Sequence, residues 1–198
     1  MGERGTGAMA RTKEFNESVV LDKAMLTFWE QGYEKTSMQD LVDNMGIHRR
    51  SIYDTFGDKH ALFMKALDQY ETELEQEISQ RLKPTMSTKE KLEELFSIVI
   101  QENSDHPKGC LIVNTATELA LLDSEVTEKV QGAFSKSENY IYRLLKEGQK
   151  NDITLKKQNL HELASYLHNA WVGIRVLAKT TNDQKKLRSI VKVTLSIL

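Results

Sequence analysis

Apolar side chains recur three and four positions apart along almost the whole chain, which is the spacing of one face of an α-helix. Residues 15–31, for example, place Val20 and Phe28 with other apolar residues on one broad face. The strict alternation of apolar and polar residues that would indicate a strand is found nowhere in the sequence. This pattern predicts an all-α fold of about nine helices, over residues 15–31, 36–45, 48–56, 58–83, 87–100, 110–122, 124–149, 160–178 and 185–198.

Glycines and capping residues indicate where these helices end and begin. Each of the first three predicted helices is directly followed by a glycine, the residue most common just past a helix end: Gly32, Gly46 and Gly57. Thr36 and Ser37 are both candidate N-caps, and Gln39 completes a capping box with Thr36. Ser87 and Glu90 form a second such box.

Composition excludes several classes of protein. The single cysteine, Cys110, cannot form an intramolecular disulfide, and no apolar run is long enough to cross a bilayer. We therefore expect a cytoplasmic protein without a membrane partner. The Gly-rich residues 1–10 are interpreted as a disordered arm or a cloning remnant.

Charge is nearly balanced, with 27 Lys and Arg residues against 29 Asp and Glu, for a net charge of −2. A polyanion would therefore have to bind a local basic patch. Within residues 47–60, Arg49, Arg50 and Lys59 oppose Asp54 and Asp58. We expect the two acids to cap helices or face away, which leaves a modest positive patch.

The most informative stretch is residues 36–59, where a turn containing Gly46 separates two short predicted helices. Such a pair is typical of a helix-turn-helix, whose second helix enters the DNA major groove. That helix begins at His48 with Arg49 and Arg50, whose side chains can donate to base edges and phosphates. The alternative is a solvated basic helix start. Since cations there oppose the helix dipole, an external anion would explain them.

Residues 15–60 resemble the N-terminal DNA-binding region of the TetR family of bacterial transcriptional repressors. The resemblance rests on Gly32-Tyr33, Thr36-Ser37-Met38, Asp40-Leu41-Val42, Gly46-Ile47, Ile52-Tyr53, Phe56-Gly57-Asp58-Lys59 and Leu62. A weaker resemblance to one branch of that family rests on Lys108-Gly109-Cys110-Leu111, Asn114, Glu118-Leu119 and Gly173-Ile174-Arg175-Val176-Leu177-Ala178.

The resemblance implies a homodimer that binds operator DNA with paired recognition helices. It also implies a C-terminal helical domain that binds a small-molecule effector and thereby moves the DNA-binding heads apart. We accordingly expect an arm at residues 1–10, a helix-turn-helix domain at 11–57 and an effector-binding and dimerisation domain at 58–198. The expected function is that of a ligand-responsive repressor, dimeric through its last two helices.

Carried over to this sequence, the resemblance assigns eight residues to DNA. Thr36 and Ser37 would bind backbone phosphate, as would Tyr53 and Lys59. Four residues would face bases or adjacent phosphates: His48, Arg49, Arg50 and Ser51. The chain departs from the family at two of these positions. His48 stands where Ser or Thr is usual, which predicts a weaker N-cap. Arg50 often corresponds to a small residue, so it would change the operator preference. The arm residues Arg11 and Lys13 would add minor-groove contacts, the alternative being an exposed disordered arm.

An all-helical regulatory domain can bind its effector in a mostly apolar pocket among the helices. The candidates for its lining, each of which could equally be an ordinary core residue, are Phe63, Leu67, Tyr70, Phe96, Cys110, Asn114, Glu118, Phe134 and Trp171. Asn114 and Glu118 lie four residues apart on an otherwise apolar helix. A buried Glu118 would need a partner, which Arg175 or a cationic ligand could supply.

Cys110 carries a second hypothesis about regulation. It follows Lys108 and Gly109 at a helix start, where the helix dipole and the Lys108 ammonium would favour the thiolate. Cys110 could therefore sense electrophiles or oxidants on the same DNA-binding scaffold, as regulators of the resembled branch do. The alternative is a buried cysteine that packs as a small apolar residue.

Two other classes compete with a DNA-binding regulator. No GxSxG, P-loop, HExxH or spaced Cys/His motif indicates an enzyme, and we expect no cofactor or metal. His161 and His168 share a helix face but lack a third ligand. The other class is a helical adaptor that never touches DNA, and the His-Arg-Arg start behind a glycine turn disfavours it.

Overall fold

The computed structural model describes residues 15–100, 106–150 and 155–198. Within these ranges it contains nine α-helices, two short 3-10 segments and no strand, which confirms the all-α prediction. The expected arm at residues 1–10 and the candidate groove contacts Arg11 and Lys13 lie outside the described residues. The helices are α1 (Glu17–Gln31), α2 (Met38–Met45), α3 (Arg49–Phe56), α4 (Lys59–Arg81), α5 (Thr88–Ile100), α6 (Leu111–Leu119), α7 (Ser124–Gly148), α8 (Leu160–Thr180) and α9 (Gln184–Thr194).

One predicted helix is clearly shorter than expected. Residues 110–122 were predicted as a single helix, but α6 ends at Leu119. Leu121 and Leu122, which we expected within a deep core helix, are 99% and 77% exposed. An apolar run therefore extended the prediction past the last helical turn, because periodicity does not distinguish a buried leucine from an exposed one.

The predicted helix ends are partly confirmed. Gly32 and Gly46 follow α1 and α2 with φ of 85° and 71°, a backbone conformation that glycine adopts without steric cost. The Ser87–Glu90 box is present, since Ser87 N–H donates to Glu90 and Glu90 N–H donates to Ser87. The Thr36–Gln39 box is wrong.

The N-cap of α2 is Ser37, and its partner in the capping box is Asp40. The Ser37 N–H donates to Asp40 Oδ2 at 2.8 Å, and Asp40 N–H donates to Ser37 Oγ at 3.1 Å. Thr36 cannot cap α2 because its hydroxyl is buried and donates to Gly32 O at 2.6 Å. The box is therefore shifted by one residue from its predicted place.

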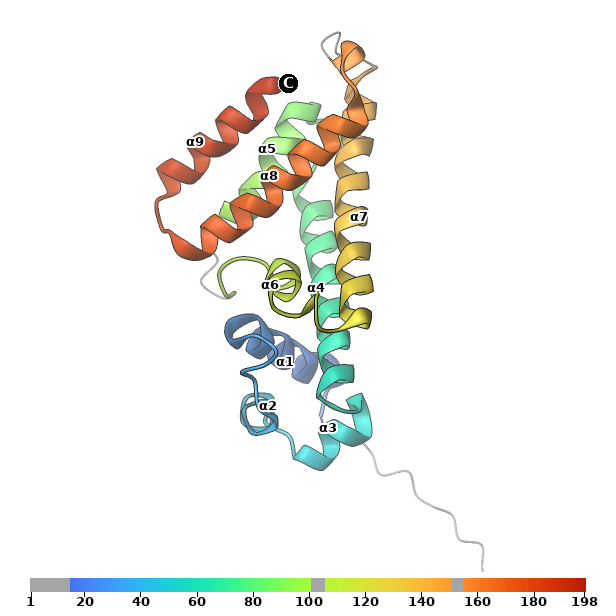
Figure 1. The fold of residues 1–198 in the computed structure, drawn as a ribbon, viewed down its shortest axis with the longest axis vertical. Helices are drawn as coiled ribbons and strands as arrows, with labels where there is room; N and C mark the ends of the chain where they lie inside the picture. The colour runs from blue at the N-terminus through green and yellow to red at the C-terminus, as the bar shows by residue number, and fades with distance from the viewer. Residues whose placement is uncertain (1–14, 101–105, 151–154) are drawn as a thin grey trace, which may run out of the picture.

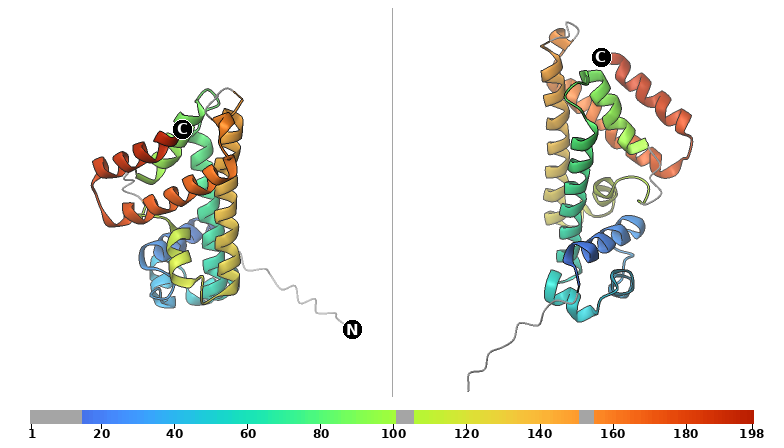
Figure 2. Two further views of the ribbon diagram at one scale, coloured as in Figure 1. Left: turned by 45° about the horizontal axis from the view of Figure 1, so that its top comes forward. Right: turned by 180° about the vertical axis from the view of Figure 1, so that it is seen from behind.

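Figure 1 shows the three short helices α1, α2 and α3 gathered at one end of the molecule. The long α4 runs out of this end beside α7, and α5, α8 and α9 form the opposite end, where the chain terminates. The views in Figure 2 agree on this order. The molecule thus has α3 at one extremity and the last two helices near the other.

Two hydrophobic cores follow this arrangement. The first joins α1–α3 and the start of α4 to α6 and the beginning of α7, through residues such as Phe28, Phe63, Ile112 and Val126. The second joins α5, the end of α7, α8 and α9. Helices α4 and α7 run past both. The end that carries α3 is therefore packed directly against α6 and α7.

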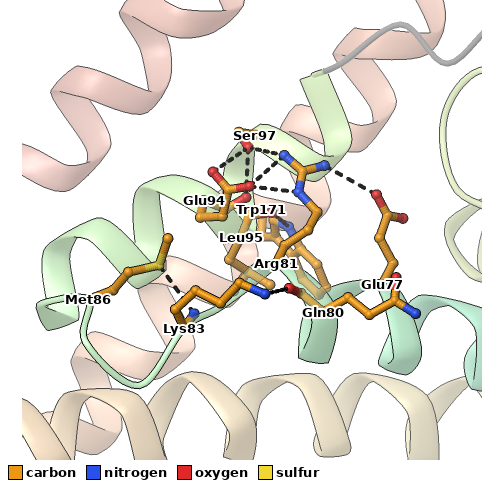
Figure 3. Close-up of polar contacts among 9 residues, drawn as sticks. All are labelled: Glu77, Gln80, Arg81, Lys83, Met86, Glu94, Leu95, Ser97 and Trp171. Carbon is orange, nitrogen blue, oxygen red and sulfur yellow. Dashed lines mark hydrogen bonds and ion pairs between the residues drawn. The ribbon is translucent and has the colours of Figure 1, made fainter.

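The far end of α4 is held on α5 by Arg81 (Figure 3). Its guanidinium donates to Glu94 Oε1 at 2.6 Å and Ser97 Oγ at 2.8 Å, and to Glu77 at 3.2 Å. In the same region the Trp171 indole of α8 donates to Leu95 O at 3.3 Å. These bonds hold α4, α5 and α8 together around one set of side chains. None of the described helices is both long and apolar enough to cross a membrane.

Candidate nucleic-acid interface and regulatory cavity

Helix α3 packs through one narrow face. Ile52 and Phe56, one turn apart, are buried against the first core. This places Arg49, Arg50 and Tyr53 on the outer side, where all three are exposed. Helix α3 itself lies at one extremity of the molecule (Figure 1). Helix α3 therefore presents a polar, cationic edge that no other described helix covers.

The start of α3 lacks a side-chain cap. His48 is the N-cap residue in an extended conformation, but its side chain makes no capping hydrogen bond. This agrees with the weaker cap that the sequence predicted. With the cations of Arg49 and Arg50 beside uncapped N–H groups, this helix start is suited to binding an anion such as a phosphate.

The two acidic residues of the patch behave differently. Asp58 caps α4, since its carboxylate accepts from Ala61 N–H at 2.8 Å. Asp54 lies 3.6 Å from Arg50 Nε, so it faces the patch and not away from it as we expected. Both side chains of this pair are exposed, 90% for Arg50 and 68% for Asp54. A surface pair of this kind contributes about 1 kcal/mol at most, so Arg50 is readily released to another anion.

The remaining residues predicted to contact DNA differ in how exposed their side chains are. Thr36 is fully buried, so its side chain cannot bind phosphate, and the expectation for it is wrong. Ser37 is exposed, although its hydroxyl donates to Asp40 at 2.6 Å. Ser51 is half-buried within α3. Lys59, at the start of α4, lies with Nζ 4.2 Å from the centroid of the Tyr33 ring.

A cavity of about 780 Å³ lies among α4, α7 and α8, with α5 and α6 contributing one residue each. Its size is in the range of sites for small organic ligands, roughly 300–1,000 Å³. Its lining consists of Glu71, Leu74, Glu75, Ile78, Ser79, Leu82, Leu95, Ile112, Ala133, Phe134, Lys136, Ser137, Asn139, Tyr140, Tyr142, Arg143, His168, Trp171, Val172 and Arg175.

Only two of the nine predicted lining residues, Phe134 and Trp171, line this cavity. The others lie elsewhere because the side of a helix that faces a cavity depends on its neighbours. Phe96 belongs to the second core, and four residues belong to the first: Phe63, Leu67, Tyr70 and Cys110. Asn114 and Glu118 are only partly buried and bond elsewhere.

The polar pair on α6 has partners that the sequence did not indicate. Asn114 Oδ1 accepts from Lys179 Nζ at 3.2 Å. Glu118 accepts from the backbone N–H groups of Tyr33 at 3.1 Å and Glu34 at 2.9 Å, just beyond α1. The expected pairing of Glu118 with Arg175 or a ligand cation is therefore wrong.

Cys110 is buried at the N-cap position of α6. Arg175 of α8 places Nη1 2.9 Å from the Cys110 sulfur and stacks its guanidinium over Trp171, 3.5 Å from the ring centroid. Lys108, the expected activating cation, instead donates to Asn182. Burial raises the pKa of Tyr70 well above its usual range, and the neighbouring Cys110 raises it further. The cation in contact with the Cys110 sulfur is therefore Arg175.

The sequence did not identify the polar residues of the cavity. Glu75 and Ser79 accompany Glu71 on the side of α4 that lines the cavity, and Arg175 accompanies His168 on that of α8, so neither residue stood out as a single polar group on an apolar face. His168 was considered only as a metal ligand. Within the described residues no group of three or more His, Cys, Asp or Glu side chains is placed to hold a metal.

Helices α8 and α9 carry several exposed apolar side chains among polar and charged ones. Exposed residues there include Tyr166 and Val176 on α8, Val193 on α9 and Ile197 just beyond it. Gly173, on the same side of α8 as Val176, has open space where a side chain would be. Helices α8 and α9 lie at the end of the molecule away from α3 (Figure 1), and their exposed apolar side chains are suited to contact with another helix pair.

Comparison with known proteins adds an independent observation. Residues 20–66 match the family described as "Bacterial regulatory proteins, tetR family", and residues 88–194 match "Tetracyclin repressor-like, C-terminal domain". A Bacillus subtilis protein described as the uncharacterized HTH-type transcriptional regulator YezE is 33% identical over 96% of this chain and 100% of its own length. The Escherichia coli HTH-type transcriptional repressor ComR is 27% identical over 94% of this chain and 90% of its own.

Solved structures show the same fold. A cysteine-substituted variant of the regulator CifR, in complex with a 26-bp double-stranded operator DNA, is 25% identical to this chain. The match covers 94% of this chain and 98% of that one, with a TM-score of 0.83.

Proposed function

Because this chain belongs to the TetR family of bacterial transcriptional regulators, we propose that it is a ligand-responsive DNA-binding repressor that its effector releases from an operator. We assign repression, not activation, because the relatives ComR and DhaR are described as transcriptional repressors. The family consists of regulators, so no catalytic activity is assigned. The protein acts in the cytoplasm, where bacterial DNA lies.

The observation that carries this function is the exposed cationic start of α3. Arg49, Arg50 and His48 face bases or adjacent phosphates of the major groove. Ser51 joins them at its half-buried position, and Ser37, Tyr53 and Lys59 contact the phosphate backbone. Thr36 contributes indirectly, because its buried hydroxyl holds the turn that positions Ser37.

Dimerisation through α8 and α9 completes the DNA-binding unit. One short recognition helix contacts too few base pairs for useful specificity, whereas two helices about one helical turn apart contact two half-sites. The exposed Val176 on α8 and Val193 on α9 supply apolar contacts for an isologous interface, and Gly173 on α8 leaves room for close approach. We retain the division into a DNA-binding domain at residues 11–57 and a regulatory domain at 58–198. Helix α4 belongs to the regulatory domain and also packs against α1–α3 in the first core.

The effector occupies the cavity among α4, α7 and α8. Helix α4 lines this cavity through Glu71 and Leu74 and also forms part of the head core through Leu62 and Phe63. A ligand that moves α4 relative to α7 therefore moves the attached head. Across a dimer this changes the separation of the two α3 helices and hence the affinity for the operator.

A second candidate is regulation through Cys110. Its sulfur lies 2.9 Å from Arg175 Nη1, so a group added to the sulfur would disturb this contact between the start of α6 and α8. Alkylation of the purified protein followed by a gel shift tests this candidate. Loss of operator binding in wild-type protein but not in Cys110→Ser would support it, and unchanged DNA binding by alkylated protein would reject it.

The DNA-binding function is tested with the double variant Arg49→Ala/Arg50→Ala in a gel shift against DNA flanking the protein's own gene. We expect the variant to remain folded and dimeric but to lose operator binding. The control is Lys156→Ala/Lys157→Ala, which removes two exposed cations far from α3. Equal operator affinity for both double variants would contradict the proposed role of α3, and a wild-type protein that binds no DNA would favour a helical adaptor.

A further inference from the structure

Two side chains on the wall of the cavity have a buried polar atom without a hydrogen-bond partner in the described part of the chain. They are Glu71 on α4, through Oε1, and His168 on α8, through Nε2. A buried polar atom left without a partner is costly, so each gains free energy from any complementary group that reaches it. Their presence at one cavity, on two different helices, indicates which ligand the cavity accepts.

The carboxylate of Glu71 is already compensated in charge. Its other oxygen, Oε2, lies 3.2 Å from Lys129 Nζ and 3.0 Å from Lys136 Nζ, and only 12% of the side chain is exposed. What Oε1 lacks is a hydrogen-bond donor, not a further positive charge. A neutral O–H or N–H group on a ligand would meet this need.

His168 is held as a neutral imidazole. Burial lowers its pKa, and the nearby Arg175 cation lowers it further, against the opposite effect of Glu138. Its ring meets Phe134 edge-on, with the centroids 5.4 Å apart, and lies near Trp171. Neutral Nε2 donates or accepts a hydrogen bond according to its tautomer, so it suits a polar group on a ligand that packs against these rings.

The rest of the lining disfavours a charged ligand. Much of the wall is apolar, through Leu74, Leu95, Ile112, Phe134, Trp171 and Val172. The wall carries charges of both signs, the acids Glu71 and Glu75 and the cations Lys136, Arg143 and Arg175. These cations already have partners, because Lys136 pairs with Glu71, Arg175 contacts Cys110 and Trp171, and Arg143 lies over the Tyr140 ring. A carboxylate ligand would therefore compete with existing contacts and face two acids. An ammonium ligand would find Glu71 already paired with two lysines. Burying a charge without a partner costs more than burying a neutral polar group.

We propose that the effector is an uncharged, largely aromatic molecule with a hydroxyl or amide group that donates a hydrogen bond to Glu71 Oε1, while a polar atom of the ligand bonds His168 Nε2. This inference rests on the proposed function, in which the cavity is the effector site. It specifies the chemistry that the site selects.

A series of naphthalene probes tests the proposal on the wild-type protein. The series is 2-naphthol, 2-methoxynaphthalene, naphthalene, 2-naphthoate and 2-naphthylmethylammonium, with binding measured by calorimetry at pH 7. We expect 2-naphthol to bind about tenfold or more tighter than 2-methoxynaphthalene and naphthalene, which cannot donate. Both charged probes should bind more weakly than 2-naphthol. Equal binding of all neutral probes, tighter binding of a charged probe, or no binding at all overturns the proposal.

Variants locate the preference within the cavity. Glu71→Gln replaces the charged acceptor with a weaker one, and His168→Phe removes the second polar atom. Each should reduce the preference for 2-naphthol over 2-methoxynaphthalene to below about threefold. The control is Thr72→Ala, on the exposed side of α4, whose hydroxyl bonds only the Asp68 carbonyl of its own helix; it should keep the full preference. A full preference in both cavity variants would overturn the assignment, and the wild-type series decides the case if a variant does not fold.

Operator binding without any probe is measured on the same samples, so that the two proposals fail differently. A wild-type protein that binds its operator but does not distinguish the probes contradicts only the effector chemistry. A protein that selects 2-naphthol but binds no operator contradicts the proposed function and leaves the chemistry of the cavity standing.

Discussion

The carboxylate of Glu118 accepts a hydrogen bond from the backbone N–H of Tyr33 at 3.1 Å, across 85 positions of sequence. Its second oxygen accepts from Glu34 N–H at 2.9 Å. Since Glu118 lies on α6 and Tyr33 directly follows α1 and Gly32, this carboxylate ties a helix that lines the cavity to the DNA-binding head. One side chain thus satisfies two backbone donors that the turn after α1 leaves open.

Replacing Glu118 with Gln should destabilise the protein. An amide has one acceptor oxygen where the carboxylate has two, so one backbone N–H loses its partner and the other loses a charged one. We expect the free energy of unfolding in urea to fall by about 1–3 kcal/mol. Glu128→Gln, at an exposed position of α7, should change it by no more than about 0.5 kcal/mol. Equal values for the two variants would show that the Glu118 bonds do not stabilise the fold.

Gly32→Ala should be destabilising for two reasons. Gly32 has φ of 85°, and a Cβ there would lie 2.9 Å from Glu118 Oε2. We expect a loss of more than about 1 kcal/mol in thermal or urea unfolding. Gly132→Ala is the matched control, because Gly132 lies inside α7 with nothing within 4 Å of the added Cβ. That change should stabilise the protein by about 0.5–1 kcal/mol, and the same sign for both would contradict the interpretation.

Operator affinity should fall with salt. We expect a dimer to contact roughly four to ten phosphates, which gives a slope of log K against log salt of about −4 to −9. At low salt, where residual binding of Arg49→Ala/Arg50→Ala can still be measured, its slope should be smaller in magnitude by about two to four, because two side chains change in each subunit. Fluorescence anisotropy over a range of KCl concentrations measures both slopes. An affinity that does not depend on salt would exclude phosphate contacts as the basis of binding.

His168 should make stability depend on pH in mildly acidic solution. Burial lowers its pKa in the folded protein below the usual 6.5, so the unfolded state takes up a proton first as the pH falls. Stability should therefore decrease from about pH 6.5 down to the lowered pKa and then level off for this group. His168→Gln should show a flatter curve over this window in urea titrations at successive pH values. Parallel curves for the two proteins would show that burial does not shift this histidine.

Helix positions and the DNA-reading element could be predicted from the sequence because their signals are local. The spacing of apolar residues within α1 or α8 and the glycines at 32 and 46 act within one or two turns of chain. The exposure of Arg49 and Arg50 follows from the same periodicity, since Ile52 and Phe56 define the buried side of an eight-residue helix. Helix caps were predicted less reliably from the local sequence. The buried Thr36 hydroxyl donates to Gly32 O, so Ser37 and not Thr36 caps α2.

The location of the cavity and the partner of Glu118 could not be predicted, because both depend on contacts between segments that are distant in sequence. Phe134 and Trp171 were chosen with Phe63, Phe96 and others on apolar character alone, which core and cavity residues share. Which of them faces open space is set by the relative placement of α4, α7 and α8. In the same way, a carboxylate on an apolar helix indicates a need for a partner. The sequence suggested an arginine, but packing of α6 beside α1 supplied backbone N–H groups from 84 and 85 positions earlier in the chain.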